Sequence, residues 1–498
     1  MTVACPACRV PVDPDAFPSP AQAVCAQCGA RVWLPRQSQK AAIDLMFSGK
    51  SAGPRPDAAL AGSAPRRRAQ AAHYNSQGVF LSRKKRFVDA IAEFTEAIAQ
   101  DPAFAQAFNN RGYAHAICGD RERALTDFDA AIRLAPAFAA AYTNRGLLHI
   151  YRRAHDLAVA DLSRAIELDP ASGLAFLNRG LVLAAEGRHG DAVADFSAAI
   201  RLQPDLVNAY HNRGFSHAAQ GDFDDALTDY DRALVINPDH HLGYFNRGFL
   251  QMLLGAFGRA GDDFAQTIRL RPEFAPAHFQ DGERHRARCD YEAARAAYGE
   301  AIRRDPNFRL AYSRRGECLT ALGRLDEAAA DFSRLIELDP DRPAGYAARG
   351  QVLTEQGRLD AAVADFSAAI RLDAEYLHAY HGRGLAHAKR GDHDQAVVDH
   401  IQAIRICPHS PEGYRNFAEF WICCPDAAAP DSDVAIELAT RACELSSWED
   451  PSCLAILALA HHQRGHADAN RWAEQALELV EEKEKEALRE KLRPALDA

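Results

Sequence analysis

Apolar and small residues recur along this chain with helical spacing, and Gly and Pro interrupt them at regular points. A clear copy of the pattern is the 34-residue stretch Val207–His240, VNAYHNRGFSHAAQGDFDDALTDYDRALVINPDH. Tyr210 and Gly214 mark one face of a first predicted helix, and Ala226 and Tyr230 mark the buried side of a second. Two short antiparallel helices bury these faces only by stacking on neighbouring pairs.

The boundaries of each copy carry their own signals. In the quoted copy, Gly221 and Asp222 end the first helix and cap the second, and Pro238 follows the second helix. The dipeptide Arg-Gly gives the register of the copies. Its spacings are all multiples of 34 residues, with the arginines at Arg111, Arg145, Arg179, Arg213, Arg247, Arg315, Arg349 and Arg383. A fixed period of this size predicts an all-α solenoid of stacked helix pairs.

Small residues stand where the two helices of a copy must approach closely. The position of Ala226 is Ala in ten successive copies, and a glycine such as Gly214 faces it from the first helix. With the aromatic residues and the closing Pro, this pattern resembles the tetratricopeptide repeat (TPR) over residues 71 to about 482. The resemblance implies a right-handed superhelix of about 12 repeats whose first helices line a concave, peptide-binding groove. We expect ten regular repeats over 71–410, two atypical repeats over 411–482 and a capping helix over 483–498.

A pair of oppositely charged residues recurs with the 34-residue period. Every copy with the Arg of the Arg-Gly dipeptide also has an Asp sixteen residues later, as in Arg213 and Asp229. In the seventh copy Asp281 and Ala297 stand at these positions, so both partners are absent together. We expect an ion pair between the two helices of a repeat or between adjacent repeats, with a structural role.

The N-terminal segment contains two tightly spaced cysteine pairs. Cys5 and Cys8 form one C-x2-C motif, Cys25 and Cys28 form another, and sixteen residues separate them. This spacing predicts a structural Zn²⁺ site with four thiolate ligands and no open coordination position. Residues 1–35 resemble the short zinc ribbons of many bacterial proteins, and residues 36–70 have the composition of a flexible linker. A redox switch is an alternative role for the cysteine pairs.

The TPR resemblance also indicates which residues face the groove. The residue before each Arg and the residue after each Gly are expected to line it. In repeats two to six these residues form an uncharged ladder and an apolar strip, namely Asn110, Asn144, Asn178, Asn212, Asn246, Tyr113, Leu147, Leu181, Phe215 and Phe249. Asn carries both a donor and an acceptor and is therefore suited to an extended peptide backbone. Alternatively, each Asn bonds only its own neighbours.

The distribution of charge along the chain bears on which kinds of partner it can bind. The net charge is −10, and residues 1–70 hold nine Lys or Arg against four Asp or Glu, which leaves −15 on the array. An acidic array does not favour nucleic acid, whereas the basic N-terminal segment with Trp33 leaves that possibility open. The start of the chain has no secretory pattern and no run is long enough for a membrane helix, so we expect a cytoplasmic protein.

These observations favour a non-enzymatic scaffold or adaptor that binds protein or peptide partners in the groove. A regulatory protein whose zinc ribbon contacts nucleic acid is the alternative. The tenth repeat contains a cluster of histidines, His378, His381, His387, His393 and His400. His378 and His381 are one helical turn apart and could form a weak metal pair, but the cluster as a whole is better explained by a structural role. The eight cysteines scattered through the array are expected to be reduced and to pack as small apolar residues.

Overall fold

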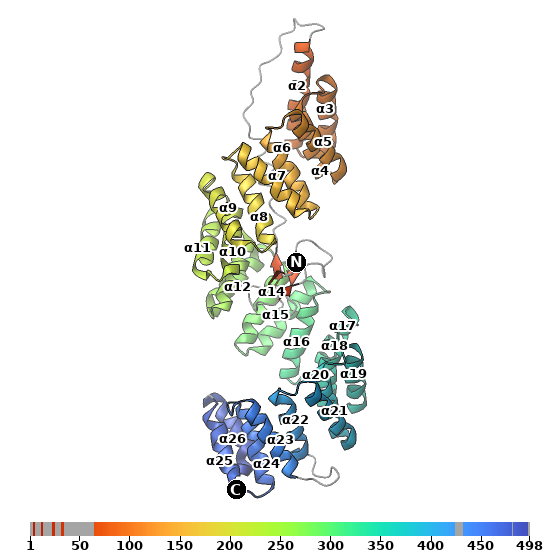
Figure 1. The fold of residues 1–498 in the computed structure, drawn as a ribbon, viewed down its shortest axis with the longest axis vertical. Helices are drawn as coiled ribbons and strands as arrows, with labels where there is room; N and C mark the ends of the chain where they lie inside the picture. Colours follow the sequence, from red (N-terminus) through yellow and green to blue (C-terminus); the bar gives the residue numbers. More distant parts are fainter. Residues whose placement is uncertain are drawn as a thin grey trace. The chain divides into compact units, whose positions relative to one another are not determined.

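The computed structural model describes strand residues 3–4, 11–12, 22–24 and 31–33, and residues 64–423, 432–480 and 482–496. The chain divides into two compact units, Met1–Ala277 and His278–Ala498. Each unit is considered by itself below. In both units, helix follows helix in pairs, and the described part of the array is entirely α-helical from residue 64 onward (Figure 1).

Short strands precede the helices. Strand β1 (Val3–Ala4) pairs antiparallel with β2 (Pro11–Val12), and β3 (Gln22–Val24) pairs antiparallel with β4 (Arg31–Trp33). In the second pair Gln22 lies opposite Trp33. The four cysteines of the predicted zinc site lie outside the described residues, and so does most of the predicted linker.

Over the described residues, the helices form twelve consecutive pairs and one further helix. Those that begin in the first unit are α2 (Ala64–Arg83), α3 (Phe87–Gln100), α4 (Ala105–Ile117), α5 (Arg121–Leu134), α6 (Ala139–Tyr151), α7 (His155–Leu168), α8 (Gly173–Ala185), α9 (His189–Leu202), α10 (Val207–Gln220), α11 (Phe223–Ile236), α12 (His241–Leu253), α13 (Phe257–Leu270) and α14 (Ala275–Ala287). The others are α15 (Tyr291–Arg304), α16 (Arg309–Ala321), α17 (Leu325–Leu338), α18 (Pro343–Glu355), α19 (Leu359–Leu372), α20 (Leu377–Arg390), α21 (His393–Ile406), α22 (Pro411–Cys423), α23 (Ser432–Leu445), α24 (Pro451–Gln463), α25 (Asp468–Glu478) and α26 (Glu482–Leu496). An all-α solenoid of about twelve repeats was expected, and these helix pairs confirm it.

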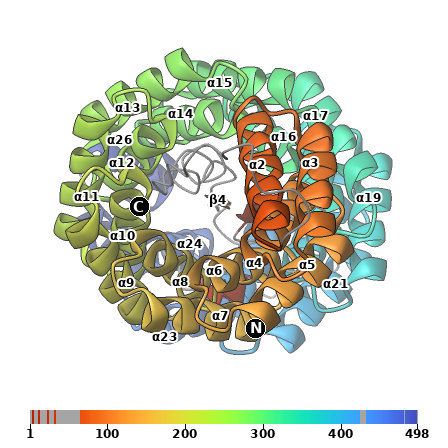
Figure 2. The same cartoon turned by 90° about the horizontal axis from the view of Figure 1, so that it is seen from above.

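In most of the regular pairs, the glycine of the first helix packs against an aromatic ring of the second helix. A Cβ on Gly180 would lie 2.7 Å from the ring of Phe196, and one on Gly282 would lie 2.5 Å from the ring of Tyr298. Both distances are too short for a side chain, so the close approach requires glycine. The predicted alanine row is buried in all ten copies, from Ala90 to Ala396. Figure 2 shows the resulting two layers, with α8, α10 and α12 on the inner side of α9, α11 and α13.

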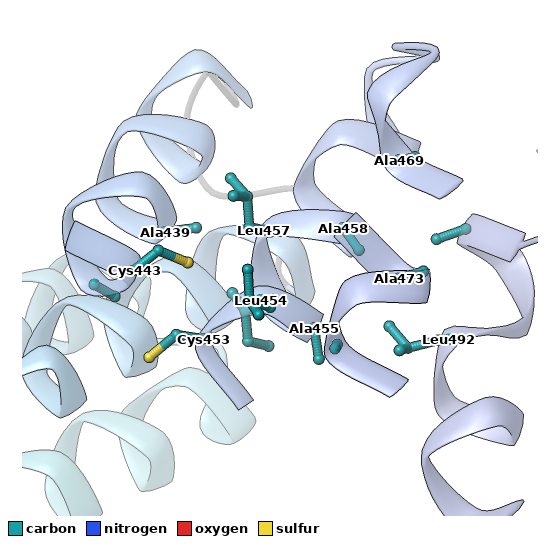
Figure 3. Packing of buried hydrophobic residues seen from close by; sticks show 14 of the residues in the cluster. Ala439, Cys443, Cys453, Leu454, Ala455, Leu457, Ala458, Ala469, Ala473 and Leu492 are labelled. Carbon is teal, nitrogen blue, oxygen red and sulfur yellow. The ribbon is translucent and has the colours of Figure 1, made fainter. Parts of the chain in front are cut away.

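The first and last helices of the array lie at its two ends. Helix α2 begins at Ala64, seven residues before the expected start at Ala71, because the intervening Ala, Arg and Gln residues have high helix propensity. At the other end α26 packs on the last repeat. Leu492 and Ala495 of α26 are fully buried in the cluster formed around Leu454 and Ala473 (Figure 3). Trp448 and Trp472 stack beside this cluster, with ring centroids 5.1 Å apart.

Candidate functional site: the inner face of repeats two to six

The predicted Arg–Asp pairs join the first helix of a repeat to the second helix of the same repeat. In all eight repeats that carry them, Nε and Nη2 of the Arg donate to the two carboxylate oxygens of the Asp of the same repeat, at 2.6–2.9 Å. In the fifth repeat the side chain of Asp229 is 4% exposed and that of Arg213 is 23% exposed. The hydrogen bond to Asp229 raises the pKa of Arg213, although burial opposes this rise. The pairing is therefore within a repeat and is a fixed, partly buried contact.

The third guanidinium nitrogen links neighbouring repeats. Nη1 of Arg213 donates to the Ser197 hydroxyl at 3.0 Å, and Nη1 of Arg145 donates to the Asp129 carboxylate at 2.6 Å. The acceptor lies sixteen residues before the Arg, on the second helix of the preceding repeat. This bond was not predicted from the sequence. The sequence does contain a pattern that could have predicted it, because Ser, Thr or Asp recurs sixteen residues before the Arg with the same 34-residue period.

We use the name "inner face of repeats two to six" for the ten residues that were predicted to line the groove. They lie in two rows on the first helices of these repeats, one row of Asn and one row of larger apolar or aromatic residues. None of the ten carries a charge. The row of Asn is mostly withdrawn from solvent, since Asn144, Asn178 and Asn212 are 5–7% exposed, whereas Asn110 and Asn246 are half-buried.

Most of these amides bond within the protein. Nδ2 of Asn110 donates to Asn75 Oδ1 at 3.0 Å, and Nδ2 of Asn144 donates to Asn109 Oδ1 at 2.9 Å, so the partner is 35 residues earlier. The Asn246 amide lies 3.3 Å from Nε2 of His211, at the same offset. These bonds fit the alternative interpretation, in which each Asn forms hydrogen bonds only with neighbouring residues of the protein.

Two members of the row depart from this offset. Leu177 occupies the partner position of Asn212, whose Nδ2 donates instead to the Asn208 carbonyl at 2.6 Å. Thr143 occupies the partner position of Asn178, but its hydroxyl donates to the Ala139 carbonyl at 3.2 Å. Among the described residues, nothing forms a hydrogen bond with the Asn178 side chain. Its amide therefore keeps its full capacity to donate and to accept.

The apolar row is more accessible. Tyr113, Leu147, Leu181, Phe215 and Phe249 are all half-buried. One helical turn further along, exposed apolar side chains extend the row, with Ile117 at 37%, Tyr151 at 53% and Leu253 at 45% exposure. Burial raises the pKa of Tyr113 to about 12, so its phenol stays protonated at neutral pH. Apolar side chains that stay accessible in successive repeats are typical of a binding surface.

The equivalent positions of the second unit have a different character. Glu283 accepts a hydrogen bond from the Tyr298 phenol at 2.5 Å and lies 3.4 Å from Arg314 Nε. Arg314 also pairs with Glu317 at 2.9 Å. At these positions of the seventh and eighth repeats, the charged side chains Glu283, Arg314 and Glu317 are therefore engaged with other residues of the protein.

The histidines of the tenth repeat have a packing role. His400 stacks on Phe417, with ring centroids 5.3 Å apart and planes at 14°, and burial lowers its pKa to about 3. His381 lies 6.3 Å from His400 between ring centroids. Within the described ranges, no group of three or more potential metal ligands occurs. Among the described residues, His378 and His381 therefore have no third potential metal ligand beside them.

Among the scattered cysteines that the structure describes, those at positions 118, 289, 318, 407, 443 and 453 form no disulfide. Burial raises the pKa of Cys443 and of Cys453 to about 12, so both thiols stay protonated. Over residues 64–423, 432–480 and 482–496, none of the helices combines the length and the apolar content needed to cross a bilayer.

Comparison with known proteins agrees with this architecture. Models described as "Tetratricopeptide repeat" match residues 80–137, 118–172, 214–288 and 280–343, and a model described as "TPR repeat" matches residues 181–221 and 350–391. Together these matches cover more than half of the chain. No curated protein matches the sequence.

Several solved structures are similar over part or most of the chain. YrrB, described as a TPR protein with an unusual peptide-binding site, is 26% identical over 35% of this chain and 89% of its own, with a TM-score of 0.30. Yeast Tom70 is 17% identical over 85% of this chain and 95% of its own, with a TM-score of 0.40. PilW, a type IV pilus biogenesis factor, is 20% identical over 41% of this chain and 94% of its own, with a TM-score of 0.38.

Proposed function

Because the chain belongs to the tetratricopeptide repeat family, whose members generally mediate protein–protein interactions, we propose that it is a non-enzymatic scaffold that binds a protein partner on the inner face of repeats two to six. The observation that carries this proposal is the half-buried apolar row from Tyr113 to Phe249, continued by exposed Ile117, Tyr151 and Leu253. Accessible apolar side chains in successive repeats are unusual on a solvent-exposed surface that binds no partner.

The partner is expected to be an extended segment with apolar side chains. The five apolar residues repeat with the period of the array and so offer successive contacts, and none of the ten inner-face residues would repel or attract a charge. The Asn178 amide is the one member of the Asn row that offers both a donor and an acceptor to a partner backbone. Asn110, Asn144 and Asn246 link successive first helices through Asn75, Asn109 and His211, and Asn212 bonds the Asn208 carbonyl of its own helix.

The experiment that tests the proposal compares partner recovery by matched variants of the full chain. Phe215→Glu with Phe249→Glu places two charges in the apolar row and should abolish recovery, because a buried carboxylate without a counter-ion is strongly unfavourable at an interface. Val235→Glu is the matched control, since Val235 is 69% exposed on the second helix of the fifth repeat. Equal recovery by the double variant and by the control would contradict the proposal.

The N-terminal segment is proposed to hold one structural Zn²⁺ through Cys5, Cys8, Cys25 and Cys28. The support is the C-x2-C spacing in the sequence, which suits a tetrahedral four-thiolate site. Metal content of the purified protein tests it, with one zinc per chain expected and loss of zinc expected for Cys5→Ser with Cys25→Ser.

A further inference from the structure

The seventh repeat departs from its neighbours at four positions that lie together. Asp281 replaces the Arg of the ion pair, Ala297 replaces its Asp, and His278 replaces the Tyr or Phe that lies under the guanidinium in most other repeats. The fourth is Gly299, at the position from which Ser, Thr or Asp accepts the inter-repeat hydrogen bond elsewhere. Gly is a poor residue for the interior of a helix such as α15, so its presence there is costly to the fold.

An open cavity of about 590 Å³ occupies the space that these side chains would fill. It lies between α14, α15 and α16, and Ala293, Ala296 and Ala297 form its apolar wall. Beside Arg179, in the first unit, a smaller cavity of about 350 Å³ lies between α7, α8 and α9, and there the Ser163 hydroxyl accepts a hydrogen bond from the guanidinium at 3.1 Å. A volume of several hundred cubic ångströms is sufficient for a small ligand or a long side chain.

Arg315 supplies the distinctive chemistry of this cavity. Its Nε and Nη2 donate to Asp331 at 2.7 and 2.6 Å, as in the other repeats. In the other seven repeats that carry the Arg, Nη1 donates to an oxygen at 2.5–3.2 Å. Among the described residues, none accepts a hydrogen bond from Nη1 of Arg315. The guanidinium therefore presents an unused charged donor to the cavity.

The acids that line the cavity are already engaged. Asp281 accepts two hydrogen bonds from Arg284, at 2.9 and 2.7 Å. Glu300 pairs with Arg303 and lies 3.6 Å from Arg304. Among the described residues, neither carboxylate pairs with Arg315, so an external acceptor does not compete with an internal one for Nη1.

We propose that this cavity binds a carboxylate, with one ligand oxygen in the place that the Ser163 hydroxyl or the Asp129 carboxylate takes in other repeats. The carboxylate belongs either to a small organic acid or to an acidic side chain of a protein partner. The alanines of α15 contact the aliphatic part of the ligand, and the Arg315 Nη1 hydrogen bond fixes its charged end. This site is separate from the inner face of repeats two to six and goes beyond the proposed function.

Calorimetric titration of the full chain tests the proposal, with acetate, succinate and a short Glu-rich peptide as probes and succinamide as the uncharged control. A Cβ on Gly299 would lie 3.5 Å from Arg315 Nη1, so Gly299→Ser restores the missing hydroxyl without a clash. We expect this variant to bind the probes at least about tenfold more weakly than the wild type, because a hydrogen bond to a charged group is lost. Gly299→Ala, which adds the methyl group but no acceptor, should keep most of the affinity.

The outcomes separate the two sources of the carboxylate. Tighter binding of succinate assigns the cavity to a small organic acid, and tighter binding of the peptide assigns it to a partner side chain. The proposal is overturned if no carboxylate probe binds in the millimolar range, if succinamide binds as well as succinate, or if Gly299→Ser binds as tightly as the wild type.

Discussion

Removing the carboxylate of Asp229 should strongly destabilise the fifth repeat. The Asp229 side chain is 4% exposed and accepts two hydrogen bonds from Arg213, at 2.8 and 2.7 Å. Hydrogen bonds to charged groups contribute about 1.5–3 kcal/mol each, and breaking a buried ion pair costs about 3–5 kcal/mol. Because Arg213 is 23% exposed and keeps some hydration, we expect Asp229→Ala to cost about 3 kcal/mol, near the lower end.

The assay must resolve a single repeat, because a long repeat array does not unfold in one cooperative step. Hydrogen exchange of the α10 and α11 amides, followed by mass spectrometry, reports the local opening free energy directly. Ser197→Ala is the matched control, since it removes only the 3.0 Å bond to Nη1 and should cost about 1 kcal/mol. Unchanged exchange in Asp229→Ala would refute the reasoning, and so would equal effects of the two variants.

Three further predictions concern other parts of the chain. Burial lowers the pKa of His240 to about 4 from its ordinary 6.5, so the unfolded chain takes up this proton first and stability falls as pH drops from 6.5 towards 4, by about 3 kcal/mol at most. His240→Phe should remove that loss, which hydrogen exchange of α10 and α12 at pH 7 and pH 4.5 measures. A thiol reagent should modify exposed Cys118 at least about tenfold faster than buried Cys443, because only the thiolate reacts. Chelation should release one zinc per chain and leave the helical circular dichroism of the array unchanged, since the predicted ligands precede residue 64.

Much of the fold could be predicted because the period repeats each packing contact many times. The pairing of Arg213 with Asp229 was predictable because both residues disappear together in the seventh copy. The start of α2 was harder to predict, because residues 64–70, which include Ala, Arg and Gln, carry no repeat signal of their own. Propensity alone extends the helix there.

The candidate site was less accessible to sequence reasoning. The Asn row could be placed on the first helices, but whether an amide faces a partner or a neighbour depends on the residue 35 positions earlier. Asn109 and His211 bond the next repeat's Asn, whereas Leu177 has no polar group to offer. The cavity beside Arg315 needs the same knowledge of the contact between repeats, since Gly299 has meaning only once its counterparts are seen to bond the next Arg.

The central claim is that a protein partner occupies the inner face of repeats two to six, and site-specific photocrosslinking tests it most directly. A photoreactive phenylalanine analogue at Phe215 should crosslink to a discrete partner in cells, and the same analogue at Val235 should not. Peptide mapping of the adduct should locate the crosslink in an extended, apolar segment of the partner. Adducts of equal yield at both positions, or none at Phe215, would contradict the account.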